Sequence, residues 1–539
     1  MGDNMSDIEI ARSCVKKEII DICHDLELDD DLLEMYGKYK AKIKYNDIIN
    51  SKNGKLILVT AINPTPYGEG KTTVSIGLLD GLRSIKKNAI AVLREPSLGP
   101  VFGFKGGAAG GGYSQIVPME DINLHFTGDL HAITSANNLI SAAVDNHIYQ
   151  GNELGIDPEK IIFKRCLDVN DRALRNKFNI TAASEVMSIF CLSNDITELR
   201  ENLGNIMIGY KFTGEPVYVR DLNLEGSLTV LLKDAINPNI VQTLENNPVL
   251  VHGGPFANIA HGCNSIIATK LGIKLADYVV TEAGFGSDLG AEKFFDIKCR
   301  KADIKPDCVV LVCTIKALKY NGGVSKEDIM KENVDAVHKG LPNLNVHIEN
   351  MLKFNSNLIV CLNKYDTDTN DEIDVVRQCC ACYNIPFVIS DSYVKGGIGS
   401  VVLAKEVCDM CEKENEFKFL YDDYISTEEK IETICREIYH AGSVVYSDLA
   451  KAKLEKIKKL DLSHLPVCIS KTQYSISDDP KVLGYPTGHE MHVRDIELYN
   501  GAGFITILMG TTIKMPGLPK VPNYEKIDLD EENEIIGLS

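Results

Sequence analysis

The sequence predicts an α/β protein built on a parallel sheet, and two observations carry this prediction. Short, continuously apolar runs rich in β-branched residues recur along the chain, and helical patterning follows most of them. Strands of a parallel sheet are buried on both faces, so they lack alternation of polar and apolar residues. The runs comprise residues 56–59, 89–93, 278–280, 309–312 and 358–362.

The remaining elements follow in chain order. Residues 1–50 are charged and have a helical pattern, which predicts a solvent-facing helical lead-in. The first apolar run precedes a glycine-rich turn and a helical stretch from Val74 to Leu82. The glycine-rich residues 105–112 predict a loop, because patterned sequence resumes directly after them. After Leu465 the pattern changes to short strands and proline-containing turns.

These changes predict three units. Residues 1–345 form a nucleotide-binding domain with a P-loop NTPase-like parallel sheet, preceded by the helical lead-in. Residues 346–465 form a second α/β domain, and residues 466–539 form a small C-terminal module. A chain of 539 residues is long enough for about three domains.

Composition excludes several classes of protein. The formal net charge of −19 argues against a general nucleic-acid binder, which needs a basic face to displace counterions. No window of 18 apolar residues occurs, so no membrane partner is expected. The 16 cysteines, without a secretory signal, indicate reduced thiols and a cytoplasmic protein.

A glycine-rich segment directly after the first apolar run has the context of a phosphate-binding loop. Its backbone N–H groups and the helix N-terminus after it can surround phosphates. Lys71 is placed to reach the terminal phosphates, and the Thr72 hydroxyl to hold Mg²⁺. Thr65 stands where such loops usually begin with glycine. The predicted nucleotide-binding residues are Thr65, Pro66, Tyr67, Gly68, Glu69, Gly70, Lys71, Thr72 and Thr73.

A second pattern supports an alternative function. Asn363-Lys364-Tyr365-Asp366 follows an apolar run and matches the guanine-reading pattern of GTPases, so a P-loop GTPase switch or chaperone is the alternative. Residues 71 and 363 are 363 − 71 = 292 positions apart, which exceeds one compact nucleotide-binding domain and argues against this alternative.

Cysteine pairs support a weaker alternative, a zinc site. Cys380 and Cys382, with Cys408 and Cys411, have spacings that resemble paired thiolate ligands. Residues 401–414 also have a helical pattern, in which the second pair lies on one face as small apolar residues.

Long motifs give the chain a resemblance to a known family. The sequence resembles formate–tetrahydrofolate ligase, also called formyltetrahydrofolate synthetase, over nearly its whole length, and no companion dehydrogenase or cyclohydrolase segment is visible. The motifs are the loop above and residues 94–100, 127–133, 251–262, 282–294 and 515–522.

The resemblance implies a monofunctional, ATP-dependent ligase of one-carbon metabolism. The family phosphorylates formate to formyl phosphate and transfers the formyl group to tetrahydrofolate, giving 10-formyltetrahydrofolate, ADP and phosphate. The implied partners are therefore formate, ATP and tetrahydrofolate, with Mg²⁺ and a monovalent cation, K⁺ or NH₄⁺. The family is usually tetrameric, so a homotetramer is expected.

The resemblance also assigns roles to single residues. Arg94 matches the arginine that binds the acyl phosphate, for which a planar guanidinium fork is suited. Glu95 and Asp129 match positions that help to hold the monovalent cation; an ion pair of Arg94 with either carboxylate is the structural alternative. His261 is a candidate proton acceptor, although a loop histidine is more often structural. The expected catalytic residues are Lys71, Arg94 and His261.

The folate site differs from the family pattern. The resemblance places two aromatic side chains on either side of the folate ring, at Tyr365 and Tyr393. Bacterial relatives typically carry Phe and Trp at these positions, and this chain contains no Trp. A phenol ring still stacks, but it offers less area than an indole. The pocket is expected to be retained, with an altered affinity for folate.

Overall fold

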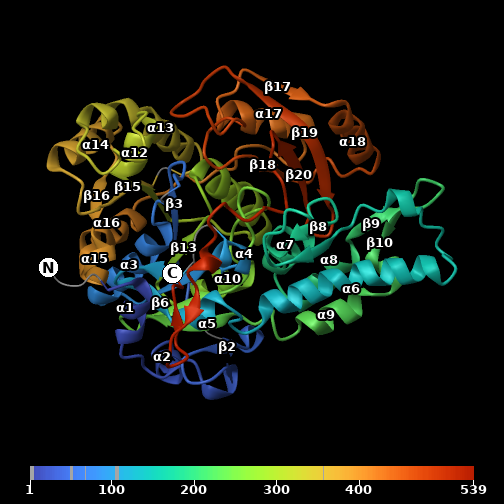
Figure 1. Ribbon diagram of the computed structural model, residues 1–539, viewed down its shortest axis with the longest axis horizontal. Coiled ribbons are helices and arrows are strands. Elements are labelled where there is room, and N and C mark those ends of the chain that lie inside the picture. Colours follow the sequence, from blue (N-terminus) through green and yellow to red (C-terminus); the bar gives the residue numbers. More distant parts are fainter. Residues whose placement is uncertain (1–4, 49–51, 67, 104–108, 356, 539) are drawn as a thin grey trace.

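The main sheet contains twelve strands among the residues that the computed structural model describes, 5–48, 52–66, 68–103, 109–355 and 357–538. Figure 1 labels several strands of this sheet in the left half of the molecule, from β15 and β16 above to β2 below. Seven neighbouring strands are parallel, in the order β12 (Pro248–Val251), β4 (Ala89–Leu93), β13 (Tyr278–Glu282), β3 (Lys55–Ala61), β14 (Cys308–Cys313), β15 (Leu358–Asn363) and β16 (Phe387–Ser390). The predicted α/β class and all five predicted strands are confirmed.

Helices cover both faces of the parallel strands, which explains the uninterrupted apolar runs. In β3, Ile57 and Val59 belong to the core beneath one helical layer, whereas Leu56 and Leu58 belong to the core beneath the other. The first layer contains α3 (Lys71–Ser84) and α16 (Val401–Cys411). The second contains α10 (Ile266–Leu275), α13 (Val334–Leu352) and α14 (Asn370–Cys382).

Strand β3 is the point at which the chain changes direction across the sheet. After β3 the chain adds β4, β12 and β13 on one side, and it then adds β14, β15 and β16 on the other. In open α/β sheets, ligands bind beyond the carboxyl ends of the strands at such a switch point. The loop after β3 occupies this position.

The helical prediction for residues 1–50 is wrong in its second half. Helices α1 (Asp7–Ser13) and α2 (Ile19–His24) form as expected, but β1 (Leu33–Met35) and β2 (Ala41–Ile43) then form an antiparallel hairpin. Strand β2 pairs with β11 (Asn239–Thr243) at the edge of the main sheet. The hairpin is stabilised by pairing with β11, a strand about 200 residues away in sequence. No local sequence pattern predicts this pairing.

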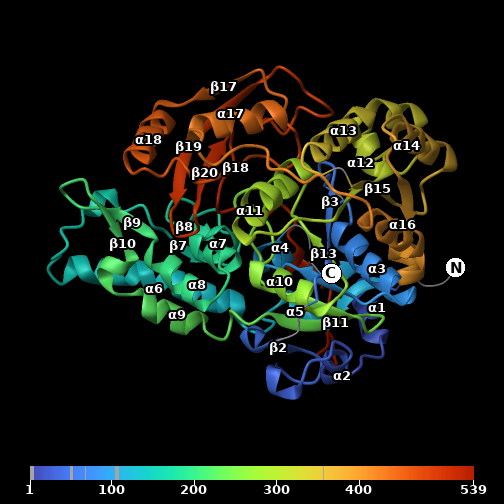
Figure 2. The ribbon, with the colours of Figure 1, turned by 180° about the vertical axis from the view of Figure 1, so that it is seen from behind.

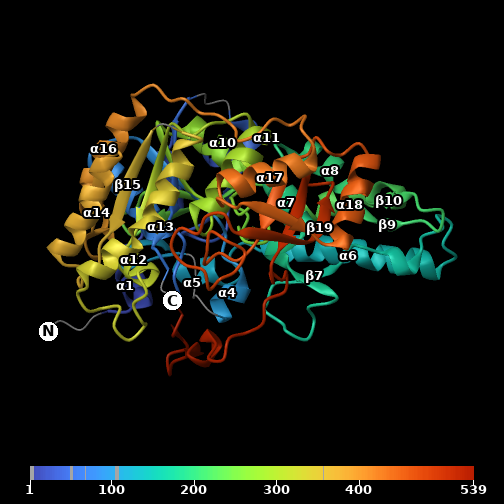
Figure 3. The same cartoon turned by 90° about the horizontal axis from the view of Figure 1, so that it is seen from above.

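Two further units flank the sheet. A helical arm contains α6 (Asp129–Tyr149), α8 (Ile196–Gly204) and α9 (Glu225–Leu232), with its own apolar core. The other unit is a four-stranded sheet in the order β17 (Ser443–Tyr446), β19 (Glu490–Tyr499), β20 (Phe504–Met509) and β18 (Val467–Ser470), with α17 (Thr427–Glu437) and α18 (Asp448–Lys459). Figure 2 shows this unit above the arm, and Figure 3 shows the arm opposite α14 and α16.

The predicted division of the chain stays a prediction. The boundary between residues 345 and 346 falls inside α13, and β15 and β16 continue the main sheet beyond it. The boundary between residues 465 and 466 falls between α18 and β18. No helix in the described part of the chain is long and apolar enough to cross a membrane.

Candidate active site

The parallel strands deliver the predicted residues to one edge of the sheet. Strand β3 leads into the predicted phosphate loop, and β4 ends directly before Arg94 and Glu95. Glu282 is the last residue of β13, and Asn363 is the last residue of β15. Because these strands are parallel, their carboxyl ends lie side by side.

The phosphate loop is fixed by a buried carboxylate. The backbone N–H and the hydroxyl of Thr65 donate to Glu69 Oε1 at 2.9 and 3.0 Å, and the hydroxyl of Thr314, after β14, donates to Glu69 Oε2 at 2.6 Å. Burial raises the pKa of Glu69, and these hydrogen bonds oppose the rise. Gly68 and Gly70 have φ of 74° and 71°, a region that glycine enters without strain. Tyr67 lies outside the described residues.

Helix α3 begins at Lys71, so the lysine and the two threonines after it form its first turn. The Thr72 hydroxyl donates to Glu282 Oε2 at 2.8 Å. The exposed ends of the first N–H groups of a helix carry partial positive charge. The helix N-terminus and the Thr72 hydroxyl therefore lie beside the carboxylate of Glu282.

Arg94 lies beside the same carboxylate. Its Nη2 is 3.6 Å from Glu282 Oε1, and its Nη1 donates to the carbonyl oxygen of Pro255 at 3.2 Å. Its Nε is buried and has no hydrogen-bond partner among the described residues. A Cβ at Gly284 would lie 2.7 Å from Nη1 and 2.9 Å from the Ala257 Cβ, so the glycine leaves room for the guanidinium in this position. The carboxylate partner is Glu282; Glu95 and Asp129 are not within ion-pair distance in the described structure.

Glu95 and Asp129 are buried close together, but only one has its charge balanced. Both Asp129 oxygens contact Lys42 Nζ, at 2.9 and 3.0 Å, and Asn239 Nδ2 donates to Asp129 at 2.7 Å. Glu95 Oε2 has no hydrogen-bond partner among the described residues. Burial raises the pKa of Glu95 well above its usual value, and the charge of Asp129 adds to the rise. No motif around Lys42 predicts this ion pair.

His261 lies in the site region but is a poor base. It is fully buried, and neither ring nitrogen has a hydrogen-bond partner among the described residues. Burial, followed by the charges of Lys298, Lys293 and Arg94, lowers the pKa of His261 to about 3. The ring is therefore neutral at physiological pH, with weak affinity for a proton. Its catalytic role stays a prediction.

The two predicted folate-facing tyrosines lie near the phosphate loop. Burial raises the pKa of Tyr365, and the neighbouring Glu69, Asp368 and Tyr393 raise it further. Lys316 Nζ lies 3.5 Å from the centre of the Tyr365 ring. Tyr393, in α15 (Ser392–Lys395), is 46% exposed, as a ring that receives a ligand must be.

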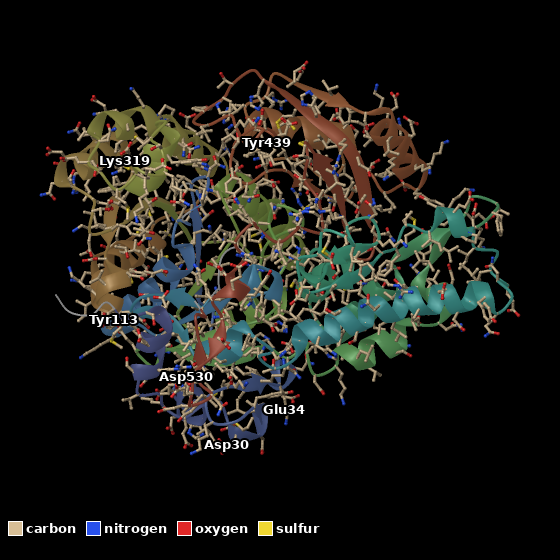
Figure 4. All side chains as sticks on the ribbon, in the orientation of Figure 1. Asp30, Glu34, Tyr113, Lys319, Tyr439 and Asp530 are labelled. Atoms are coloured by element: carbon tan, nitrogen blue, oxygen red, sulfur yellow. The ribbon has the colours of Figure 1, made fainter. Side chains whose placement is uncertain are left out.

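The last two glycines of the glycine-rich residues 105–112 pack against Tyr393, whereas residues 105–108 lie outside the described part of the chain. A Cβ at Gly112 would lie 2.1 Å from the carbonyl oxygen of Tyr393, and one at Gly111 would lie 3.1 Å from its ring. The backbone N–H of Tyr113 donates to the Tyr393 carbonyl oxygen at 2.8 Å. Tyr113 is labelled in Figure 4, at the end of the sheet near α15.

The argument from sequence distance against a shared nucleotide site is wrong. Asn363 Nδ2 donates to the carbonyl oxygen of Glu69 at 3.2 Å, and a Cβ at Gly70 would lie 2.3 Å from this nitrogen. The residues between these two positions build other strands and the arm, so β15 lies two strands from β3 in the same sheet. The choice between ATP and GTP has to rest on other grounds.

A family model for formate–tetrahydrofolate ligase matches residues 5–539. The chain belongs to this family. Formate–tetrahydrofolate ligases are ATP-dependent enzymes of one-carbon metabolism, with ATP and tetrahydrofolate as substrates. Family membership, rather than the geometry around Asn363, therefore excludes the GTPase alternative. For the zinc alternative, the described residues include no group of three or more His, Cys, Asp or Glu side chains arranged for a metal ion.

Three residues that contact the predicted site residues were absent from the predicted set. Glu282 ends β13 and contacts both Thr72 and Arg94; Thr314 holds Glu69; Lys316 covers the ring of Tyr365. Glu282 is the first residue of the motif 282–294, and its position at the carboxyl end of an apolar run is a signal that could have identified it. Thr314 and Lys316 also lie just beyond the carboxyl end of an apolar run, the one that forms β14.

Proposed function

We propose that the chain joins formate to tetrahydrofolate through a formyl phosphate intermediate held at the carboxyl edge of the sheet. One observation carries the proposal: a guanidinium, a helix N-terminus and the Thr72 hydroxyl converge on Glu282. Phosphoryl transfer needs positioned positive charge and a metal ion rather than a protein nucleophile. The arrangement supports a P-loop NTPase-like nucleotide site.

The first step is the phosphorylation of formate. A formate oxygen attacks the γ-phosphorus of ATP, and the bond to the bridging oxygen breaks to release ADP. Lys71 and the N–H groups of the loop stabilise charge on the phosphoryl oxygens. Thr72 and Glu282, whose oxygens are 2.8 Å apart, fit Mg²⁺, which prefers few protein ligands and completes its shell with phosphate and water.

The second step is transfer to an amine. A nitrogen of tetrahydrofolate attacks the formyl carbon, phosphate leaves, and the nitrogen loses its proton. Arg94 binds the phosphate portion through its fork. In this proposal Tyr365 and Tyr393 stack on the folate ring, and Lys316 covers one face of Tyr365. Because its pKa is lowered, His261 is a candidate only for accepting this proton transiently.

The monovalent cation fits beside Glu95 rather than Asp129. Oε2 of Glu95 has no hydrogen-bond partner in the described part of the chain and can serve as an oxygen ligand, whereas Asp129 is already bonded to Lys42 and Asn239. A K⁺ or NH₄⁺ ion there would favour the ionised form of Glu95. We further propose a cytoplasmic homotetramer.

The proposal is tested by turnover assays of the purified protein in which ATP, formate and tetrahydrofolate are omitted in turn. Formation of 10-formyltetrahydrofolate is expected only when all three are present, and GTP is expected to replace ATP poorly. Turnover that needs no formate, or that proceeds equally with GTP, would contradict the proposal.

The Tyr393→Trp variant is expected to bind tetrahydrofolate more tightly. An indole offers more stacking area than a phenol, and aromatic pairs contribute about 0.5–1.5 kcal/mol beyond burial. The measurement is the Michaelis constant for folate, with Tyr113→Trp as the matched control on a neighbouring, 49% exposed tyrosine. An unchanged or higher constant in Tyr393→Trp would remove this residue from the folate site.

A further inference from the structure

A network of buried hydrogen bonds surrounds Asn63, two residues before the phosphate loop. The Asn63 side chain donates to Asp288 Oδ1 at 3.1 Å and accepts from Asn343 Nδ2 at 2.9 Å. Its backbone N–H donates to His347 Nε2 at 2.9 Å. Each of these residues is at most 1% exposed. The backbone that enters the phosphate loop is therefore held by side chains remote in sequence.

The partners of Asn63 come from different parts of the fold. Asn343 and His347 are one turn apart on α13, and Asp288 belongs to the π-helical turn Ser287–Ala291 after β13. Lys471, directly after β18, forms a fully buried ion pair with Asp288 at 2.8 Å. Lys471 Nζ lies 4.8 Å from the ring centre of Tyr439, which Figure 4 labels in the C-terminal unit.

The hydrogen bonds define one tautomer of His347. The Asn63 N–H points at Nε2, so Nε2 has to be the unprotonated nitrogen. Nδ1 then carries the proton and donates to the Ser287 hydroxyl oxygen at 2.7 Å. The Asn63 side-chain oxygen also lies 3.0 Å from Nε2 and accepts from Asn343; its second lone pair stays open to an Nε2 proton, whereas the Asn63 N–H has no other acceptor among the described residues. The opposite tautomer would leave the buried Asn63 N–H without an acceptor, which is costly.

Burial also keeps this ring neutral. Desolvation lowers the pKa of His347 to about 4, although the charge of Asp288 opposes the change. The facing charged groups are Asp288, Lys471 and, farther off, His440. A neutral ring at physiological pH agrees with an acceptor nitrogen on the side of Asn63.

We propose that His347 is a positioning residue of the phosphate loop. Its Nδ1-protonated ring holds the Asn63 amide and so sets the direction of the backbone that carries the phosphate-binding N–H groups. The inference rests on the proposed role of this loop as the ATP site. His347 does not touch substrate and acts only through Asn63.

The tautomer is measured directly in unsubstituted protein labelled with ¹⁵N-histidine, by long-range ¹⁵N–¹H correlation. The His347 signals are assigned by their loss in His347→Gln. The expected result is a proton on Nδ1 and a ring that stays neutral at pH 6. His252 provides the opposite standard, because its Nε2 donates to the Ala235 carbonyl oxygen at 2.8 Å. A proton on Nε2 of His347 would overturn the proposal.

Variants test the consequence for ATP. In His347→Leu the Asn63 N–H loses its acceptor, and the dissociation constant for Mg·ATP is expected to rise at least about tenfold. In His347→Gln, the amide oxygen reaches the position of Nε2 and is expected to restore affinity to within about threefold. In His347→Asn the side chain is too short and is expected to behave like leucine. Calorimetry with Mg·ATP alone measures these constants.

Two controls separate positioning from general damage. His147→Leu removes the same kind of bond, from the Leu154 N–H to His147 Nε2 at 3.1 Å, in the distant arm. It is expected to leave ATP affinity unchanged. Tetrahydrofolate affinity is expected to stay within about twofold in every folded His347 variant.

Equal ATP affinity in His347→Leu and the unsubstituted protein would overturn the proposal. It would also be overturned if His347→Gln bound Mg·ATP no more tightly than His347→Asn. If His347→Leu does not fold, the proposal is tested by the measured tautomer of His347 and by the ATP affinities of His347→Gln and His347→Asn. Protein that binds ATP with this dependence on His347 but makes no 10-formyltetrahydrofolate would contradict the proposed function and leave this inference standing.

Discussion

Replacing Arg94 with alanine is expected to lower turnover at least about a hundredfold, the scale for losing one charge-stabilising donor in an active site. The guanidinium lies at the end of β4, admitted by Gly284 and held by Pro255 and Glu282. Its buried Nε lacks a partner among the described residues, so this side chain has unused capacity to bind an anion. The measurement is the steady-state turnover number with all three substrates saturating.

The Arg94→Lys variant distinguishes charge from geometry. Lysine keeps the positive charge but cannot present two parallel N–H donors to a phosphate. We expect Arg94→Lys to recover only part of the loss. A near-native turnover number in Arg94→Ala would remove the arginine from the reacting centre.

Replacing Lys71 with alanine is expected to cause a loss of similar size, at least about a hundredfold in turnover. Lys71 is the first residue of α3, where its charge adds to that of the helix N-terminus. A phosphate loop from which this lysine is missing loses the group that reaches the transferred phosphoryl. Binding of Mg·ATP and turnover are both measured.

Lys87→Ala is the matched control for Lys71→Ala. Lys87 is an exposed lysine just beyond the opposite end of the same helix. Its replacement is expected to leave turnover within about twofold of the unsubstituted value. Comparable losses in both variants would indicate damage to α3 rather than loss of a phosphate contact.

The parallel core could be predicted from sequence because each of its strands has a local pattern, a continuous apolar run. A strand buried on both faces has to be apolar throughout, and each run named from the sequence became a strand. The glycines of the phosphate loop were readable for the same reason, since a left-handed backbone at residues 68 and 70 demands them.

The parts that could not be predicted depend on contacts between distant segments. The β1–β2 hairpin is stabilised by pairing with β11, and Lys42 reaches Asp129 only because of that pairing. Asn363 reaches the phosphate loop because the sheet places β15 near β3, which a count of intervening residues cannot reveal. His347 was not noticed in the sequence because nothing in α13 marks its contact with Asn63.

In the proposed mechanism, a formate oxygen becomes bonded to the phosphorus of ATP before the formyl group reaches folate. The decisive measurement uses formate labelled with ¹⁸O in both oxygens, with ATP, tetrahydrofolate and the purified protein. Mass spectrometry of the released phosphate is expected to show one ¹⁸O atom per phosphate, transferred from formate. Phosphate that carries no label, while 10-formyltetrahydrofolate accumulates, would contradict the account.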